Sequence, residues 1–92
     1  KFILINVGVI QPRKNQLFLI KSLELLKNKD IILLLIGPIQ NEFKPYYEKI
    51  KKHVHEHNLS NQVLFLGEKK NVNEYMNAAD LAVFSSKNIP LY

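Results

Sequence analysis

Six consecutive apolar residues near the middle of the chain constrain its fold more than any other feature. The run Ile31–Ile36 reads IILLLI and is closed by Gly37 and Pro38. A short strand that is apolar throughout is typical of the centre of a parallel sheet, where both faces of the strand are buried. Parallel neighbours require long crossover connections, usually helices, so we expect strands and helices to alternate along the chain.

The rest of the sequence shows this alternation. Three further apolar runs predict strands at residues 2–7, 63–66 and 81–84. Apolar residues at helical spacing predict helices at residues 16–27, 43–57 and 72–79. The order βαβαβαβ implies a Rossmann-like α/β fold with a parallel sheet and right-handed crossovers.

Asparagine residues stand at three predicted helix ends. Asn15 is expected to cap the first helix, and Asn58 is expected to end the second. Asn71 and Glu74 have the spacing of a capping box at the start of the third helix. Pro45 falls in the first turn of the second helix, where a missing N–H group does no harm.

Composition narrows the class of protein only slightly. The 92 residues form one domain or part of one, and the net charge of +5 suits an anionic partner. There are no cysteines, which fits a reducing compartment and excludes a disulfide framework. No apolar run reaches the roughly 20 residues of a membrane span. The aromatic residues do not form a ribonucleoprotein motif, so we expect no nucleic-acid partner.

Two adjacent cations, Arg13 and Lys14, lie in the loop between the first strand, ended by Gly8, and the helix that follows Asn15. Helix N-terminal N–H groups and basic side chains meet at the carboxyl edge of a parallel sheet, which favours a phosphate site. An ordinary solvated basic turn stays open as the alternative. The loop has neither a dinucleotide fingerprint nor a Walker lysine.

Two other loops belong to the same predicted edge. Gly37 and Pro38 follow the second strand, and Gly67, Glu68 and Lys69 follow the third. Glycine allows a backbone to approach a ligand closely, although strand termination explains each glycine taken alone. Because three such loops are expected on one rim, we treat them together as candidate nucleotide-binding loops.

Other chemistry-bearing residues form no recognisable catalytic group, and no catalytic residue is assigned. His53, His55 and His57 form the segment HVHEH, in which His53 and His57 share one helix face. His57 is expected to belong to the apolar stripe of its helix, and no third ligand is evident, so we expect no metal. Ser85 and Ser86 lack the surroundings of a nucleophile elbow.

Three stretches together resemble a known family. They are ILINVGVIQPRKNQLFLIKSLELL, IILLLIGP and VLFLGEKKNVNEYMNAADLAVFSS. They are similar to the C-terminal domain of group 1, or family 4, glycosyltransferases. The resemblance implies a GT-B enzyme with sheet order 3-2-1-4 in this domain. It also implies retaining transfer of a sugar from a nucleoside diphosphate sugar to a glycan, lipid or small acceptor, without a metal.

The resemblance also implies roles for the loop residues. Lys14 aligns with the family's diphosphate-binding lysine, and Gly8 aligns with the glycine that ends its first strand. Arg13 could add charge beside them. The turn at Gly37 and Pro38 aligns with the turn near the nucleotide. The loop from Gly67 to Lys69, including Glu68, aligns with the loop that meets the base.

The chain departs from the family pattern in two places. Val9 stands where the family usually has arginine, and no glutamate follows Ser86 within residues 87–90. The resemblance implies that residues 1–92 are a truncated donor-binding domain whose N-terminal acceptor domain is absent, so the chain alone is expected to be inactive.

The alternative to an enzyme part is a non-catalytic module with the same fold that binds nucleotide or self-associates. The apolar strand within residues 81–86 is expected to leave an exposed edge that supports a homodimer. We expect the parent protein in the cytoplasm, with peripheral association at the inner face of the membrane as a further expectation.

Overall fold

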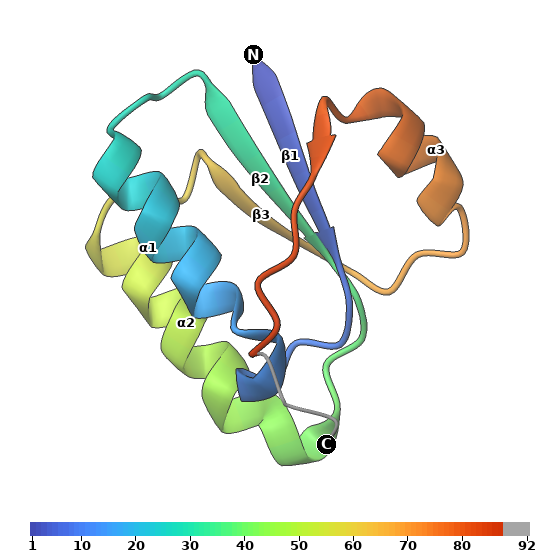
Figure 1. The fold of residues 1–92 in the computed structure, drawn as a ribbon. Helices are drawn as coiled ribbons and strands as arrows, with labels where there is room; N and C mark the ends of the chain where they lie inside the picture. The colour runs from blue at the N-terminus through green and yellow to red at the C-terminus, as the bar shows by residue number, and fades with distance from the viewer. Residues whose placement is uncertain (88–92) are drawn as a thin grey trace, which may run out of the picture.

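A computed structural model of the chain describes residues 1–87. The predicted departure at residues 88–90 and the chain end therefore lie outside the described residues. Figure 1 shows a sheet flanked by helices. The elements in chain order are β1 (Phe2–Val7), η1 (Pro12–Lys14), α1 (Gln16–Leu26), β2 (Ile31–Ile36), η2 (Asn41–Phe43), α2 (Lys44–Glu56), β3 (Val63–Gly67), α3 (Val72–Ala78) and β4 (Leu81–Ala82).

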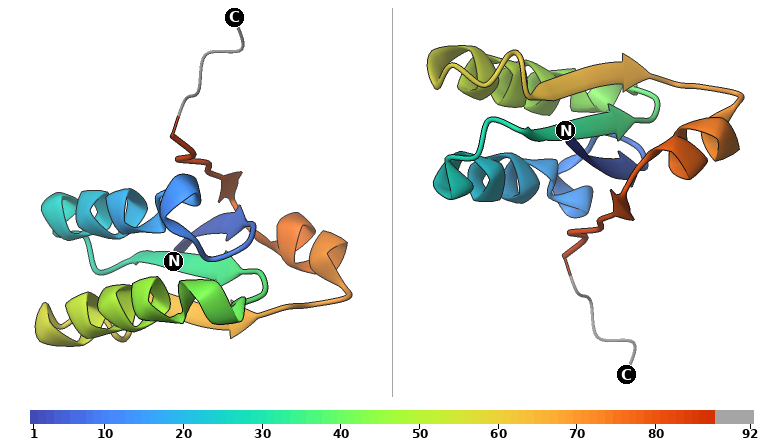
Figure 2. Two further views of the ribbon diagram at one scale, coloured as in Figure 1. Left: turned by 90° about the horizontal axis from the view of Figure 1, so that it is seen from below. Right: turned by 90° about the horizontal axis from the view of Figure 1, so that it is seen from above.

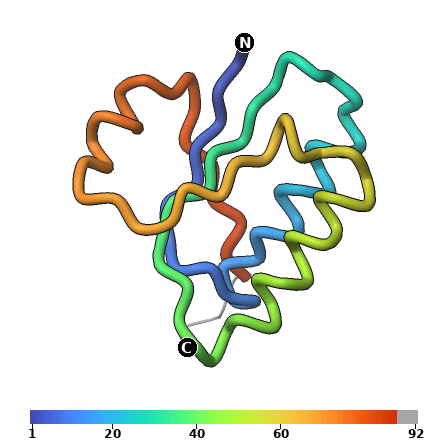
Figure 3. The backbone as a smooth tube through the Cα atoms, turned by 180° about the vertical axis from the view of Figure 1, so that it is seen from behind, coloured from blue at the N-terminus to red at the C-terminus, as the bar shows by residue number. Residues whose placement is uncertain are grey.

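The four strands form one parallel sheet in the order β3-β2-β1-β4, as expected. The chain steps from β1 to β2 to β3 in one direction and then returns past β1 to β4. Right-handed crossovers that run in opposite directions place their helices on opposite faces of the sheet. Figures 1 to 3 show this arrangement, with α1 and α2 side by side on one face and α3 on the other.

The main core lies between the sheet and the pair α1 and α2. Its buried members come from β2, β3, both helices and the loops beside them: Ile10, Ile20, Leu23, Leu33, Leu35, Ile50, Val54, Leu59 and Val63. On the opposite face Ile5 and Ile36 are also buried, while Leu64 at the β3 edge is 39% exposed. The prediction that β2 is central, with buried residues on both faces, is therefore confirmed.

The predicted strand at residues 81–84 is shorter in the structure. Only Leu81 and Ala82 pair with β1, opposite Leu4 and Ile5. The Val83 N–H group still donates to the Ile5 carbonyl at 2.8 Å, but the ladder stops there. Residues beyond Val83 leave the sheet edge because they turn toward the loop after β1 instead. The strand expected within residues 81–86 is thus wrong in its length.

The first helix is not capped as expected. Asn15 adopts a left-handed conformation with φ 57°, and its side chain makes no capping hydrogen bond. The Tyr46 hydroxyl from α2 instead accepts a hydrogen bond from the Leu17 N–H group at 3.1 Å. This bond satisfies one of the free donors at the helix start. The cap is therefore tertiary, which a local pattern cannot reveal.

The ends of α2 and α3 agree only in part with the predictions from the sequence. Asn58, with φ 58°, follows the end of α2 in the left-handed conformation that favours asparagine, and Pro45 lies in the first turn. The Asn71 amide donates to the Glu74 carboxylate at 3.1 Å, a bond between side chains. No side chain caps the backbone of α3, so the predicted capping box is wrong.

Candidate functional site

The carboxyl ends of β1, β2 and β3 meet at one rim of the sheet. The Gly8 N–H group donates to the Ile36 carbonyl at 2.8 Å, and the Gly37 N–H group donates to the Gly67 carbonyl at 2.9 Å. A further hydrogen bond holds the backbone after β1 against the loop after β2, because the Ile10 N–H group donates to the Pro38 carbonyl at 3.1 Å. The three predicted glycine loops therefore lie together, as their position in the sequence implied.

Gly37 is required at this rim by the close approach of another backbone. A Cβ atom added there would lie 1.8 Å from the Gly8 carbonyl oxygen, and Gly37 has φ +155°. Gly67 differs, because a Cβ atom would meet no atom within 4 Å, yet φ is +73°. Space excludes a side chain at Gly37, whereas backbone conformation alone disfavours one at Gly67. The strand ends can pack this closely only because of Gly37.

The side chain of Lys14 crosses the end of β1. A Cβ atom on Gly8 would lie 3.8 Å from both the Cδ and Cε atoms of Lys14, so the aliphatic stem packs over that glycine. Lys14 is half-buried, whereas Arg13 is exposed. The structure thus brings Lys14 and Gly8 together and leaves Arg13 exposed next to Lys14 in the turn Pro12–Lys14.

The segment after β4 is tied to this same loop. The Ser85 Oγ atom lies 3.0 Å from the Lys14 carbonyl and 2.9 Å from the Asn15 carbonyl, so its single proton is shared between two acceptors. The Lys87 N–H group donates to the Arg13 carbonyl at 2.9 Å. In a sheet of this order, β1 and β4 flank the point where the chain reverses direction, which is the usual ligand crevice.

Two buried polar side chains support the loop from below. The Asn6 amide donates to the Val83 carbonyl at 2.9 Å and so holds the start of the segment after β4. The Gln16 amide donates to the Val9 carbonyl at 3.0 Å. Within residues 1–87 the buried Gln16 Oε1 atom has no hydrogen-bond partner. Sequence reasoning missed these supports and Ser85, although Asn6 interrupts an apolar strand and was a visible signal.

The charges at the rim are unpaired within the described part of the chain. None of the ion pairs found among residues 1–87 involves Arg13 or Lys14. Glu68 is exposed and Lys69 half-buried in the loop after β3. No hydrogen bond or ion pair between described residues joins their side chains to the loop after β1. The rim therefore presents cations that are free to meet an anion.

One tyrosine beside the rim has a shifted pKa. Burial raises the pKa of Tyr46 above its ordinary value, and the N–H groups of Leu17 and Gln16 at the start of α1 oppose that shift. The Tyr46 hydroxyl therefore stays protonated at neutral pH. It accepts the Leu17 bond as a neutral group and adds no negative charge near the cations of the rim.

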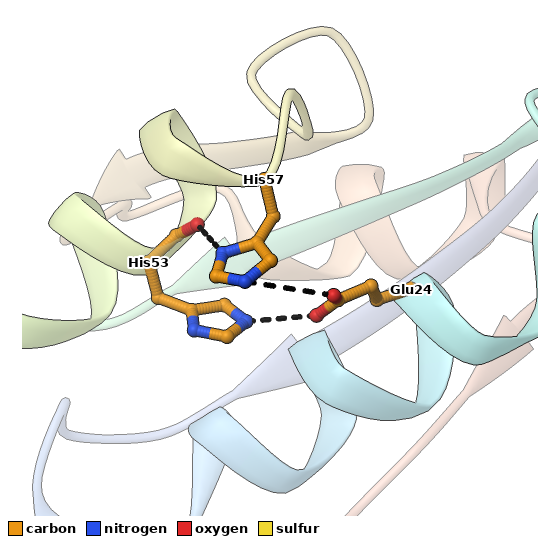
Figure 4. Close-up of side chains that lie close together, drawn as sticks. All are labelled: Glu24, His53 and His57. Carbon is orange, nitrogen blue, oxygen red and sulfur yellow. Dashed lines mark hydrogen bonds and ion pairs between the residues drawn. The ribbon is translucent and has the colours of Figure 1, made fainter.

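A second cluster lies at the far end of α1 and α2. Glu24 lies near the end of α1, while His53 and His57 are one turn apart near the end of α2 (Figure 4). His57 is exposed rather than part of the apolar stripe, and that expectation is therefore wrong. The hydrogen bond from His53 lowers the Glu24 pKa, and burial opposes the shift. Glu24 is a third potential ligand that the helical spacing of the histidines could not reveal.

Within the described part of the chain, every helix falls short of the length or the apolar character needed to cross a lipid bilayer.

Comparison with known sequences identifies a family and a relative. The family model described as glycosyl transferases group 1 matches residues 1–89. An uncharacterized glycosyltransferase of Methanocaldococcus jannaschii is 33% identical over 89 residues, which is 92% of this chain and 20% of the relative. The chain thus spans about a fifth of the curated relative it matches.

Comparison with solved structures identifies the same fold. HepE from Anabaena, crystallised with UDP, superimposes with a TM-score of 0.90 at 24% identity, covering 96% of this chain and 24% of HepE. The C-terminal domain of LpcC, a group 1 family glycosyl transferase from Francisella tularensis, gives a TM-score of 0.85 at 21% identity. That match covers 94% of this chain and 47% of the LpcC chain. The predicted fold of a GT-B C-terminal domain is confirmed.

Proposed function

This chain belongs to the group 1 glycosyl transferases, and on that premise we propose that it forms part of the donor-binding domain of a retaining enzyme. The whole protein would transfer a hexose from a nucleoside diphosphate sugar to a glycan, lipid or small acceptor. The acceptor side of the cleft would come from another domain, and we expect no sugar transfer by this chain alone.

The observation that carries the proposal is the position of Lys14 across the end of β1. Its stem packs over Gly8, and its charge is unpaired among the described residues. The loop that holds it faces the segment after β4 at the reversal point of the sheet. A cation fixed at this crevice suits a diphosphate better than a neutral ligand. HepE, which has the same fold, was crystallised with UDP and with UDP and glucose.

Each rim residue then has a proposed role. Lys14 binds the diphosphate, and Arg13 adds a second positive charge at the turn. Gly8 ends β1 beneath the stem of Lys14, and the turn at Gly37 and Pro38 would lie near the nucleotide. The loop Gly67–Lys69 meets the base. As the bond from the anomeric carbon to the diphosphate breaks, negative charge grows on the leaving oxygen, and the two cations stabilise it without a metal.

A second candidate function is a non-catalytic module that binds nucleotide or self-associates. Val9 in the loop after β1, and Leu81 and Phe84 beside the β4 edge, which are 52% and 67% exposed, favour it. Exposed apolar side chains next to an unpaired edge are suited to contact with another copy. Such a module would catalyse no sugar transfer, whether or not it binds nucleotide.

Calorimetric titration of the 92-residue chain with UDP and with GDP tests the proposal. Lys14→Ala should weaken binding by about 10- to 100-fold, since a charge-assisted hydrogen bond contributes roughly 1.5–3 kcal/mol. Lys29→Ala is the matched control, because it removes one exposed lysine from the opposite end of β2 and changes the net charge equally. Circular dichroism would confirm that both variants fold.

The outcomes separate the two candidate functions. Saturable nucleotide binding that Lys14→Ala weakens and Lys29→Ala preserves supports the donor-site assignment. Absence of saturable binding by the unaltered chain, with stable self-association in sedimentation, would support the assembly module and contradict the role of Lys14. Equal weakening by both variants would show a general charge effect rather than a site.

A further inference from the structure

Three potential metal ligands lie together between α1 and α2, at the end of the sheet away from the rim. The Nε2 atom of His53 is 2.8 Å from one carboxylate oxygen of Glu24, and the Nε2 atom of His57 is 3.8 Å from the other (Figure 4). The three potential ligand atoms all lie within 4.8 Å of one another. We propose that these residues form a binding site for one divalent zinc-type cation that links the two helices.

The spacing suits coordination. Zinc bonds to imidazole nitrogen and carboxylate oxygen are both about 2.0–2.2 Å long, so neighbouring ligands of a tetrahedral ion lie roughly 3.3 Å apart. The two observed nitrogen-to-oxygen separations fall on either side of that value. Histidines four residues apart on a helix are a recurrent zinc-binding arrangement. Small rotations of the Glu24, His53 and His57 side chains would bring all three around one ion.

The hydrogen bond of His57 leaves its other nitrogen ready to bind a cation. The His57 Nδ1 atom is 2.9 Å from the His53 carbonyl oxygen, which can only accept, so Nδ1 carries a proton. In the neutral ring, Nε2 then presents a lone pair toward the Glu24 carboxylate. Both groups can therefore bind the same cation. Histidine ligands of metals commonly donate their second N–H group to a carbonyl in this way.

The remaining ring takes part through a change of tautomer. With no metal bound, the Nε2–H group of neutral His53 donates a hydrogen bond to the Glu24 carboxylate. On coordination that proton moves to Nδ1, and bonds from nitrogen and oxygen to the cation replace the hydrogen bond. The two rings are already stacked, with centroids 4.0 Å apart. The nitrogens can therefore reach one ion without a backbone movement.

The surroundings leave the proposed cation open to solvent on one side. Three protein ligands leave one position for water, and the His57 side chain is 43% exposed. A surface hollow lined by Leu23, Asn58, Leu59 and Gln62 lies beside Glu24 and His57 and offers access. Lys27 and Lys29 line the same hollow, and their charge lowers the affinity that the ligands alone would give. The site is separate from Lys14, so nucleotide binding does not depend on it.

Calorimetric titration of the EDTA-treated chain with Zn²⁺ in a non-chelating buffer tests the site. We expect one bound ion per chain, and at least tenfold weaker binding in His57→Gln, His53→Gln and Glu24→Gln. His55→Gln is the matched control, because His55 lies on the same helix but outside the cluster. Co²⁺ should give the visible absorption of a tetrahedral site, and His57→Gln should remove it.

Several results would overturn the proposal. They are no saturable Zn²⁺ binding by the unaltered chain, equal binding by His57→Gln, or equal weakening by His55→Gln, which would indicate adventitious surface histidines. His57 is exposed, so its replacement should leave the fold intact, which circular dichroism would check. UDP titrations of the same samples keep this test separate from the nucleotide proposal.

Discussion

The close approach at Gly37 predicts a graded response to alanine at the three rim glycines. In Gly37→Ala the new Cβ atom would lie 1.8 Å from the Gly8 carbonyl oxygen and 2.5 Å from its carbon. Both are backbone atoms, so relief requires the ends of β1 and β2 to move apart. That movement strains the bonds from Gly8 to the Ile36 carbonyl and from Gly37 to the Gly67 carbonyl.

The expected loss of stability in Gly37→Ala has two contributions, the strained backbone conformation and the steric clash. A positive φ costs an L-residue roughly 1–2 kcal/mol, and overpacking against a backbone typically costs about 1–3 kcal/mol. Gly37→Ala should therefore lower the free energy of unfolding by roughly 2–5 kcal/mol. Gly67→Ala should lower the free energy of unfolding by about 1–2 kcal/mol, which is the cost of the positive φ alone, because nothing lies within 4 Å of its Cβ position. Gly8→Ala should change stability by less than about 1 kcal/mol, since its Cβ atom would make ordinary contacts with Lys14.

Urea unfolding followed by far-ultraviolet circular dichroism measures all three variants by linear extrapolation. The expected order of destabilisation is Gly37→Ala, then Gly67→Ala, then Gly8→Ala. If Gly37→Ala fails to fold while the other two variants fold, the reasoning stands. A Gly37→Ala chain that is no less stable than Gly67→Ala would refute it, because the steric part would then be absent.

Three further predictions concern the supports of the rim and the sheet edge. Ser85→Ala should lower the free energy of unfolding by about 1 kcal/mol in urea, since the loop after β1 loses a hydrogen-bond donor. Tyr46→Phe should cost about 1 kcal/mol at pH 7 by leaving the Leu17 N–H group without its acceptor. Burial raises the pKa of Tyr46 above 10, so the hydroxyl's contribution to the free energy of unfolding is intact below pH 10. That contribution is lost as the pH rises through the raised pKa. The stabilities of wild type and Tyr46→Phe should therefore converge in alkaline urea titrations. Phe84→Lys should reduce self-association through the β4 edge, and a wild-type chain that sediments as a monomer at high concentration would contradict the homodimer.

The architecture could be predicted from sequence because its determinants are local. The apolar run Ile31–Ile36 has buried residues on both faces of the sheet, and its central place follows from that burial. Helical periodicity located α1 and α2 to within a few residues. The end of β4 was missed because Val83 and Phe84 are as apolar as the paired residues before them. A strand's length depends on where its neighbour's ladder ends, which no local pattern records.

The site could be predicted only where glycine and charge mark it. Gly8, Lys14 and Gly37 were found because strand-ending glycines and loop cations stand out in a sequence. Ser85 was missed because its partners are at least 70 residues away in sequence. Glu24 was missed for a similar reason, since it reaches His53 across 29 residues and only the packing of two helices joins them.

The bond from Ser85 to the Lys14 carbonyl spans 71 residues, which sets an order for assembly during synthesis. A nascent chain that has released residue 70 already contains β1, β2 and β3, and can form the close glycine contact at Gly37. The loop that carries Lys14 lacks its anchor until Ser85 leaves the ribosome. Pairings between residues so distant form late, because a long loop must close first. The rim should therefore become competent for an anion only after the strands β1, β2 and β3 beneath it have paired.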